Sequence, residues 1–150
     1  MTEQQWGPET DGLAISVYVA RPSYRAGEQI DLHLDLKNAG SSPAILVRQS
    51  AWADYSLVMR TQNGVELPPT PYVQDRIEAA MEGRQATSEL QPGQMTEDTL
   101  ELDRAYDLSV PGRYTIRVTR KVFRPGNYGE MVTLTSNELI IELVERVAQR

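Results

Sequence analysis

The chain has 150 residues, of which 40% are hydrophobic and 24% charged, a composition typical of one folded globular domain. Its formal net charge of -6 argues against a nucleic-acid partner, because binding to a phosphate backbone depends on clustered Lys and Arg. The lack of cysteine excludes disulfides, thiolate metal ligands and a cysteine nucleophile.

The amino-terminal arm, residues 1–11, is polar and lacks the cationic start and apolar stretch of a signal peptide. The sequence as written therefore predicts a cytoplasmic protein, whereas a signal peptide replaced at Met1 would make it extracytoplasmic. The sequence does not distinguish between these two compartments. No segment approaches the roughly 18 consecutive apolar residues of a membrane span. We expect Trp6 to pin the arm to the domain.

Alternating apolar and polar residues predict a series of half-buried strands. The first contains Ile15, Val17 and Val19, and the clearest runs from Ile30 to Leu36, with Asp31, His33 and Asp35 on its polar face. Further strands are predicted around residues 44–49, 57–61, 100–102, 114–118 and 139–143.

Turn signals separate these strands. The pairs Pro92-Gly93, Pro111-Gly112 and Pro125-Gly126 each favour a type II turn, because proline presets the first central φ and glycine supplies the positive second one. Asn63-Gly64 indicates a tight hairpin between residues 57–61 and 65–67.

One stretch has helical spacing instead. Val73, Ile77, Ala80 and Met81 fall on one face of a short helix, which Gly83 would end at the C′ position. The helix lies in a crossover between two strands, and we expect Tyr72 to pin that crossover to the domain.

Taken together, the pattern predicts an all-β protein: an immunoglobulin-like antiparallel β-sandwich of about seven to nine strands, with one short helix in a crossover connection. Residues 12–146 form the sandwich, residues 1–11 an arm and residues 147–150 a carboxy-terminal tail.

A local motif adds a family resemblance. The spacing Leu108-x-x-x-Gly112-x-Tyr114-x-Ile116 resembles a strand entry of bacterial immunoglobulin-like domains. With residues 26–32, 36–41 and 90–93, the order of motifs is similar to that in two groups. These are the non-catalytic domain of deuterolysin-type metallopeptidases and the intracellular proteinase inhibitor family of bacilli. The resemblance implies that Tyr114, after Pro111 and Gly112, forms a structural tyrosine corner.

Catalytic chemistry finds little support. The zinc helix of a deuterolysin-type peptidase needs two histidines, and this chain has one, so the resemblance does not carry peptidase activity over. That residue, His33, lies between Asp31 and Asp35 on a polar strand face, which we interpret as a solvated surface because zinc sites need three or four convergent ligands. The sequence also lacks a serine nucleophile elbow and a glycine-rich phosphate loop. We predict no metal, no cofactor and no enzymatic activity.

The leading hypothesis is therefore a non-enzymatic module that binds a protein through loops, as an accessory domain or a small binder. A basic, partly aromatic segment within this acidic chain supplies the contact candidates: Arg120, Lys121, Phe123, Arg124, Asn127 and Tyr128. The other interpretation of this segment is that Phe123 caps the core and the arginines pair with acidic strand faces. The alternative functions are proteinase inhibition and carbohydrate binding through exposed Trp52 and Tyr55. The oligomeric state stays open.

Overall fold

The structure is a computed structural model that describes residues 3–146, so the predicted tail at residues 147–150 lies outside the described residues. The described part contains ten strands and three short helices. The strands are β1 (Leu13–Tyr18), β2 (Ser23–Arg25), β3 (Asp31–Asn38), β4 (Ala44–Arg48), β5 (Ser56–Thr61), β6 (Ala86–Leu90), β7 (Met95–Glu101), β8 (Gly112–Arg124), β9 (Asn127–Thr135) and β10 (Leu139–Val144). The helices are α1 (Ala51–Asp54), α2 (Pro71–Glu82) and α3 (Leu102–Ala105). The predicted all-β sandwich is confirmed, with more elements than the sequence indicated.

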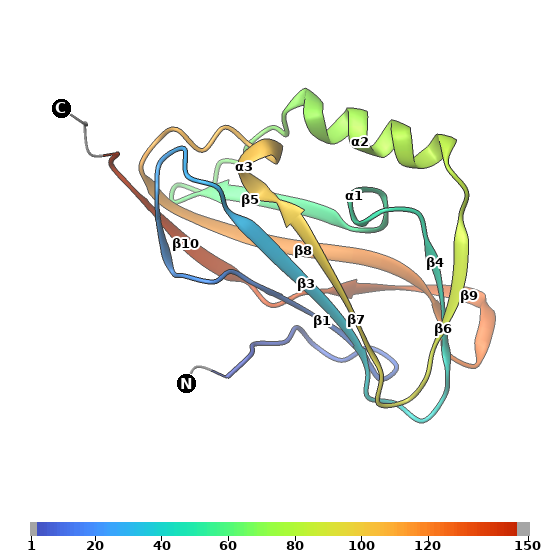
Figure 1. Cartoon of the computed structure of the whole chain (residues 1–150). Coiled ribbons are helices and arrows are strands. Elements are labelled where there is room, and N and C mark those ends of the chain that lie inside the picture. Colours follow the sequence, from blue (N-terminus) through green and yellow to red (C-terminus); the bar gives the residue numbers. More distant parts are fainter. Residues whose placement is uncertain (1–2, 147–150) are drawn as a thin grey trace.

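Two main sheets form the layers of the sandwich (Figure 1). The β3 sheet has the order β1-β3-β7, and the β8 sheet has the order β2-β10-β8-β5, with β9 also paired to β8. Strands β4 and β6 pair with each other at the end of the molecule where β9 lies. Strands β2 and β10 run parallel, so the expected antiparallel arrangement fails at that pair.

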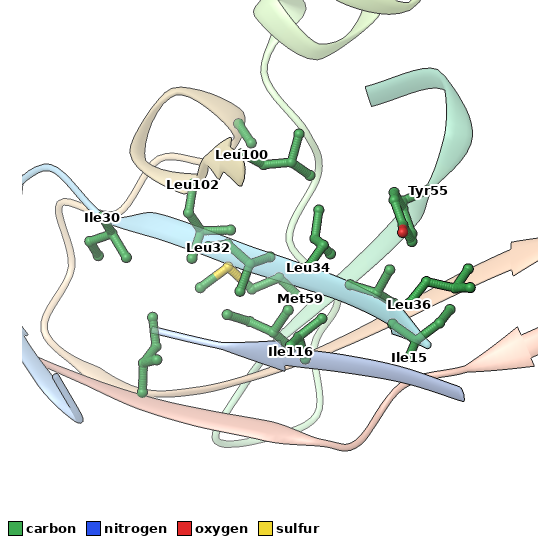
Figure 2. Close-up of a cluster of buried hydrophobic side chains, with 14 of the residues drawn as sticks. Ile15, Ile30, Leu32, Leu34, Leu36, Tyr55, Met59, Leu100, Leu102 and Ile116 are labelled. Carbon is green, nitrogen blue, oxygen red and sulfur yellow. The ribbon is translucent and has the colours of Figure 1, made fainter. Parts of the chain in front are cut away.

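The core lies between these two sheets. Alternate residues of β3, Leu32, Leu34 and Leu36, point into it and meet Met59 from β5 and Ile116 from β8 (Figure 2). Each is almost fully buried, and burying one such side chain stabilises the fold by roughly 1.5–3 kcal/mol. The period-two pattern thus buries one face of each strand in a shared interior.

Strand β8 is the longest and holds the β8 sheet together. Its first part pairs with β10 from Gly112 to Ile116, and its last part pairs with β9 from Thr119 onward. On the opposite edge, residues 114–119 pair with β5. One continuous strand therefore aligns three others.

The strand predicted around residues 100–102 begins earlier than expected, at Met95, and ends one residue sooner. Strand β7 ends at Glu101, and Leu102 begins α3. The Leu102 amide donates to the carbonyl of Ile30 at 2.9 Å, and the Ile30 amide donates to the Asp103 carboxylate at 3.1 Å. These bonds turn the chain away from the sheet while Leu102 stays buried in the core.

The predicted turns differ in outcome. Gly93 and Gly126 have φ values of 87° and 81°, as the second central position of a type II turn requires. Gly112 has a φ of 151° and already belongs to β8, so Pro111-Gly112 is not such a turn. At the predicted hairpin, the Thr61 amide donates to the Val65 carbonyl at 2.8 Å.

The predicted crossover helix is confirmed as α2, between β5 and β6. The amide of Thr70 donates to the carbonyl of Ala105 at 2.8 Å, which fastens the start of α2 to α3. Gly83 follows the helix with a φ of -82°, so it does not adopt the left-handed conformation expected at C′. Helices α1 and α3, of four residues each, were not predicted.

The arm before β1 lies along the β3 sheet. Gln4 Nε2 donates to the Asp35 carboxylate at 2.7 Å, and Lys37 Nζ lies 4.3 Å from the centre of the Trp6 ring. At Gly7 the arm approaches β9 so closely that an added Cβ would lie 2.0 Å from the Thr135 carbonyl oxygen. The arm therefore covers part of the outer face of the β3 sheet.

Tyr114 has the geometry of a tyrosine corner. Its ring is buried, and its hydroxyl donates to the carbonyl of Val110 at 2.6 Å, four residues upstream. We expect Tyr114→Phe to lower the free energy of unfolding by about 1 kcal/mol, since one buried hydrogen bond is lost while the ring remains. Urea denaturation followed by circular dichroism measures this, and an unchanged midpoint would contradict a stabilising role for the hydroxyl.

Candidate functional site

The β8–β9 hairpin carries most of the predicted contact residues. Its two central residues are Pro125 and Gly126, and Arg124 pairs with Asn127 across the turn. A register shift between Phe123 and Arg124 leaves residues 128–130 of β9 without opposed partners on β8. Such a bulge bends the hairpin away from the flat sheet.

Exposed apolar side chains gather beside this bulge. Phe123 of β8 is half-buried and pairs in register with Met131 of β9, so both point to the outer face of the sheet. Met131 is 55% exposed and Tyr128 is 45% exposed, and the charged Lys121 lies two residues before Phe123 on the same face. We call Lys121, Phe123, Tyr128 and Met131 the hairpin patch. Met131 was not among the predicted contact residues, because a regular two-residue turn would pair Phe123 with Tyr128 and only the register shift brings Met131 opposite Phe123.

The other predicted hairpin residues have mixed roles. Asn127 is exposed, and its side-chain oxygen accepts a hydrogen bond from the amide of Gly129 at 3.3 Å. Arg124 forms ion pairs with Glu130 at 2.6 Å and with Asp11 at 3.1 Å. The Asp11 pair fastens the turn to the start of β1. Through these two ion pairs, Arg124 stabilises the conformation of the hairpin and its position beside β1.

Arg120, which we predicted to lie on the contact surface, is buried. Its side chain is 2% exposed and points inward like Ile116 and Val118. One Nη donates to the carbonyl of Val47 at 3.2 Å, and the guanidinium lies 4.8 Å from the centre of the Tyr55 ring. It also faces the Asp54 carboxylate at 3.9 Å. The even position of Arg120 in the β8 alternation was the sequence signal for this burial.

Arg120 belongs to a buried polar cluster that the sequence analysis missed. From β7 it includes Asp98, which pairs with Arg48 of β4 at 3.4 Å. Burial raises the pKa of Asp98 above its ordinary value, although Arg48 and Arg120 oppose this shift. Burial likewise raises the pKa of Tyr55 against the charge of Arg120. The charges of this cluster neutralise one another inside the domain.

The raised pKa of Asp98 predicts a pH effect. Because the folded state holds the Asp98 proton more tightly than the unfolded state, protonation favours folding. We compare the free energy of unfolding of the wild type with that of Asp98→Asn. The difference, wild type minus variant, should rise as pH falls toward 3.8, the ordinary pKa of aspartate, and should level off below that pH. Urea titrations of both proteins between about pH 7 and pH 3 measure this difference. A difference that shrinks with falling pH would mean that Arg48 stabilises the carboxylate more than burial penalises it.

The predicted sugar-stacking pair does not form a platform. Tyr55 is 3% exposed and lies against Arg120. Trp52 is half-buried under α2, where its ring meets that of Tyr72 edge-on, with 5.8 Å between the ring centroids. These rings fasten the crossover helix to the sandwich. A sugar needs an exposed aromatic plane, so the geometry gives carbohydrate binding here no support.

His33 lies where the sequence placed it, on the polar face of β3. Its ring stacks on that of Tyr18, with 4.9 Å between the centroids, and its Nδ1 lies 3.4 Å from the Thr99 hydroxyl. The neighbouring Asp35 is buried beneath Gln4 of the arm. Within residues 3–146, no three His, Asp or Glu side chains gather as metal ligands.

The cavities that border the described residues include two near the sheet edges. One, of about 580 Å³, lies between the arm, the link after β1 and the start of β10, and it is lined by Tyr18, Val19 and Ile140 among others. The second, of about 410 Å³, lies beside Asp54, Arg120 and Lys121. The described helices include none that is both long and apolar enough to cross a membrane.

Comparison with known proteins supports the fold. No family model and no curated protein matches the chain, so the resemblance to deuterolysin-type peptidases and bacillar proteinase inhibitors finds no support there. Among solved structures, the chain is similar to the crystal structure of the C-terminal domain of Wzt, with a TM-score of 0.51 and 16% identity. The match covers 97% of this chain and 78% of that one. At this identity the likeness shows a shared β-rich fold.

Proposed function

We propose that this chain is a non-enzymatic binding module that contacts a partner protein through the hairpin patch. The observation that supports it most is the exposure of Met131, which pairs with the half-buried Phe123, and of Tyr128 in the adjoining bulge. Aromatic residues and methionine are enriched at the centres of protein interfaces, and neighbouring exposed apolar side chains mark such surfaces. The β8–β9 ladder and the ion pairs of Arg124 order the patch before binding, which lowers the entropic cost of association.

The absence of enzymatic activity is part of the proposal. His33 stacks on Tyr18, and the most buried carboxylate, Asp35, accepts a hydrogen bond from Gln4, while Asp54 and Asp98 face arginines. Asp54 and Asp98 therefore balance the positive charges of Arg120 and Arg48. The similar solved structure is itself one domain of a longer protein, which supports an accessory role. The peptidase-inhibitor alternative rested on a resemblance without support and is not proposed.

Site-specific photo-crosslinking tests the proposal. A benzophenone amino acid replaces Tyr128 in one protein and Val110, which is 62% exposed outside the patch, in a control. After irradiation in a native lysate, we expect a protein adduct at position 128 that is absent at position 110. In the second arm, the label stays at position 128 and Met131→Ser is added, which should weaken the same adduct. Identical adducts at both positions would contradict the hairpin patch as the contact site.

A further inference from the structure

The outer face of the β8 sheet is defined by the same alternation that builds the core. On β8, odd-numbered residues from Arg113 to Phe123 point outward, and the pairing places Arg60 of β5 beside Thr115. Glu142 of β10 pairs with Arg113, and Arg25 of β2 pairs with Val144. The cationic residues of this face are Arg25, Arg60, Arg113, Arg117 and Lys121.

This face carries a charge opposite to that of the chain. Three acidic residues lie beside these cations: Glu142 opposite Arg113, Glu66 in a bridge with Arg60, and Glu138 paired with Arg117. Five cations against three acidic residues still leave this face positive, whereas the whole chain has 21 Asp and Glu against 15 Lys and Arg. Across the sandwich, the outer face of the β3 sheet holds acidic residues that pair in register with one another. They are Asp31 with Glu101 and Asp35 with Glu97, and Lys37 is the cation beside them. Asp35 is buried beneath Gln4 of the arm, but Asp31, Glu97 and Glu101 still make this outer face acidic, opposite in sign to that of the β8 sheet.

Most of these cations form no ion pair within the described residues. All five are exposed, and Arg117 pairs with Glu138 at 2.8 Å. Between residues 3 and 146, the other four form no ion pair. Lys121 belongs to both this face and the hairpin patch, so the two surfaces are continuous.

We propose that the partner of the hairpin patch is a protein with an acidic surface, which docks on the outer face of the β8 sheet. This inference rests on the proposed function and names the chemistry of its partner. The charge pattern would steer an acidic surface toward this face and away from the acidic β3 face.

The spacing of the cations favours an acidic protein over a nucleic acid. On β8, Arg113, Arg117 and Lys121 lie four residues apart, or about 13 Å at the rise of an extended strand. Duplex DNA presents one charge per about 1.7 Å, which sparse cations neutralise poorly. Between them lie threonines and Ile140, which is 51% exposed. A flat protein surface with scattered carboxylates fits this pattern.

Fluorescent poly-L-glutamate of about 30 residues is the probe. The face variant combines Arg60→Gln, Arg113→Gln and Lys121→Gln, and the control combines Arg76→Gln, Arg84→Gln and Arg146→Gln, which are exposed outside the sheet. Both remove three positive charges. By anisotropy at about 50 mM salt, we expect the face variant to bind at least 10-fold more weakly than the wild type and the control less than 3-fold more weakly. Thermal melts establish that both variants fold.

Equal weakening by both variants, or no binding by the wild type, would overturn the inference. So would tighter face-dependent binding to a 20-base-pair DNA duplex or to phosphatidylserine vesicles than to poly-L-glutamate. Salt-sensitive self-association that the face variant abolishes would make a second copy the occupant and would also overturn it. If poly-L-glutamate does not bind while the cross-link at position 128 still forms, the proposed function is retained and the inference of an acidic partner is wrong.

Discussion

Arg120→Ala is expected to lower the free energy of unfolding by about 3 kcal/mol, because it leaves a buried carboxylate without its cation. The Asp54 side chain is 8% exposed and faces Arg120 at 3.9 Å. The substitution also removes the partner of the Val47 carbonyl and opens space beneath the Tyr55 ring. Urea denaturation measures the loss.

Arg117→Ala is the matched control for this substitution. Arg117 lies on the same strand, but it is exposed and pairs with Glu138 at the surface, so its loss should cost less than about 1 kcal/mol. Combining Arg120→Met with Asp54→Asn should recover part of the stability, since the charge and its counter-charge are removed together. A loss below about 1 kcal/mol for Arg120→Ala would show that solvent reaches Asp54 readily.

Ile141→Ala is expected to cost about 3 kcal/mol, because the side chain is fully buried in the core cluster and its removal leaves a cavity. The adjacent Ile140 provides the control, since it is 51% exposed on the other face of β10. Ile140→Ala should cost less than about 1 kcal/mol. The same denaturation assay applies to both.

The comparison of the two isoleucines tests the register of β10 directly. A slip of one residue would exchange their environments and reverse the order of the two losses. Equal losses would mean that β10 lies between two apolar layers, contrary to the open outer face on which the docking proposal depends.

The sequence correctly predicted a hairpin at the candidate contact segment, but not all six of its candidate residues are exposed. Lys121, Asn127 and Tyr128 are exposed, whereas Arg124 is half-buried and ion-paired and Arg120 is buried. Average composition places arginine at the surface, and that preference hid the alternation that turns Arg120 inward. The burial of Trp52 and Tyr55 was also missed. The helix that covers Trp52 comes from a later part of the chain, so local patterns did not indicate it.

Local patterns were sufficient for seven strands, for the positive φ of Gly93 and Gly126 and for α2, because backbone conformation depends on neighbouring residues, whereas β2, β6 and β9 were not among the strands predicted. Period-two alternation determined which side of each strand is apolar, as Leu32, Leu34 and Leu36 show. Tertiary structure decided which outer faces are covered, which strands run in parallel and how the buried charges meet. The arm over Asp35, the parallel β2–β10 pair and the Arg120–Asp54 contact each join residues far apart in the sequence. Their energies arise from burial and pairing that exist only after the chain has folded.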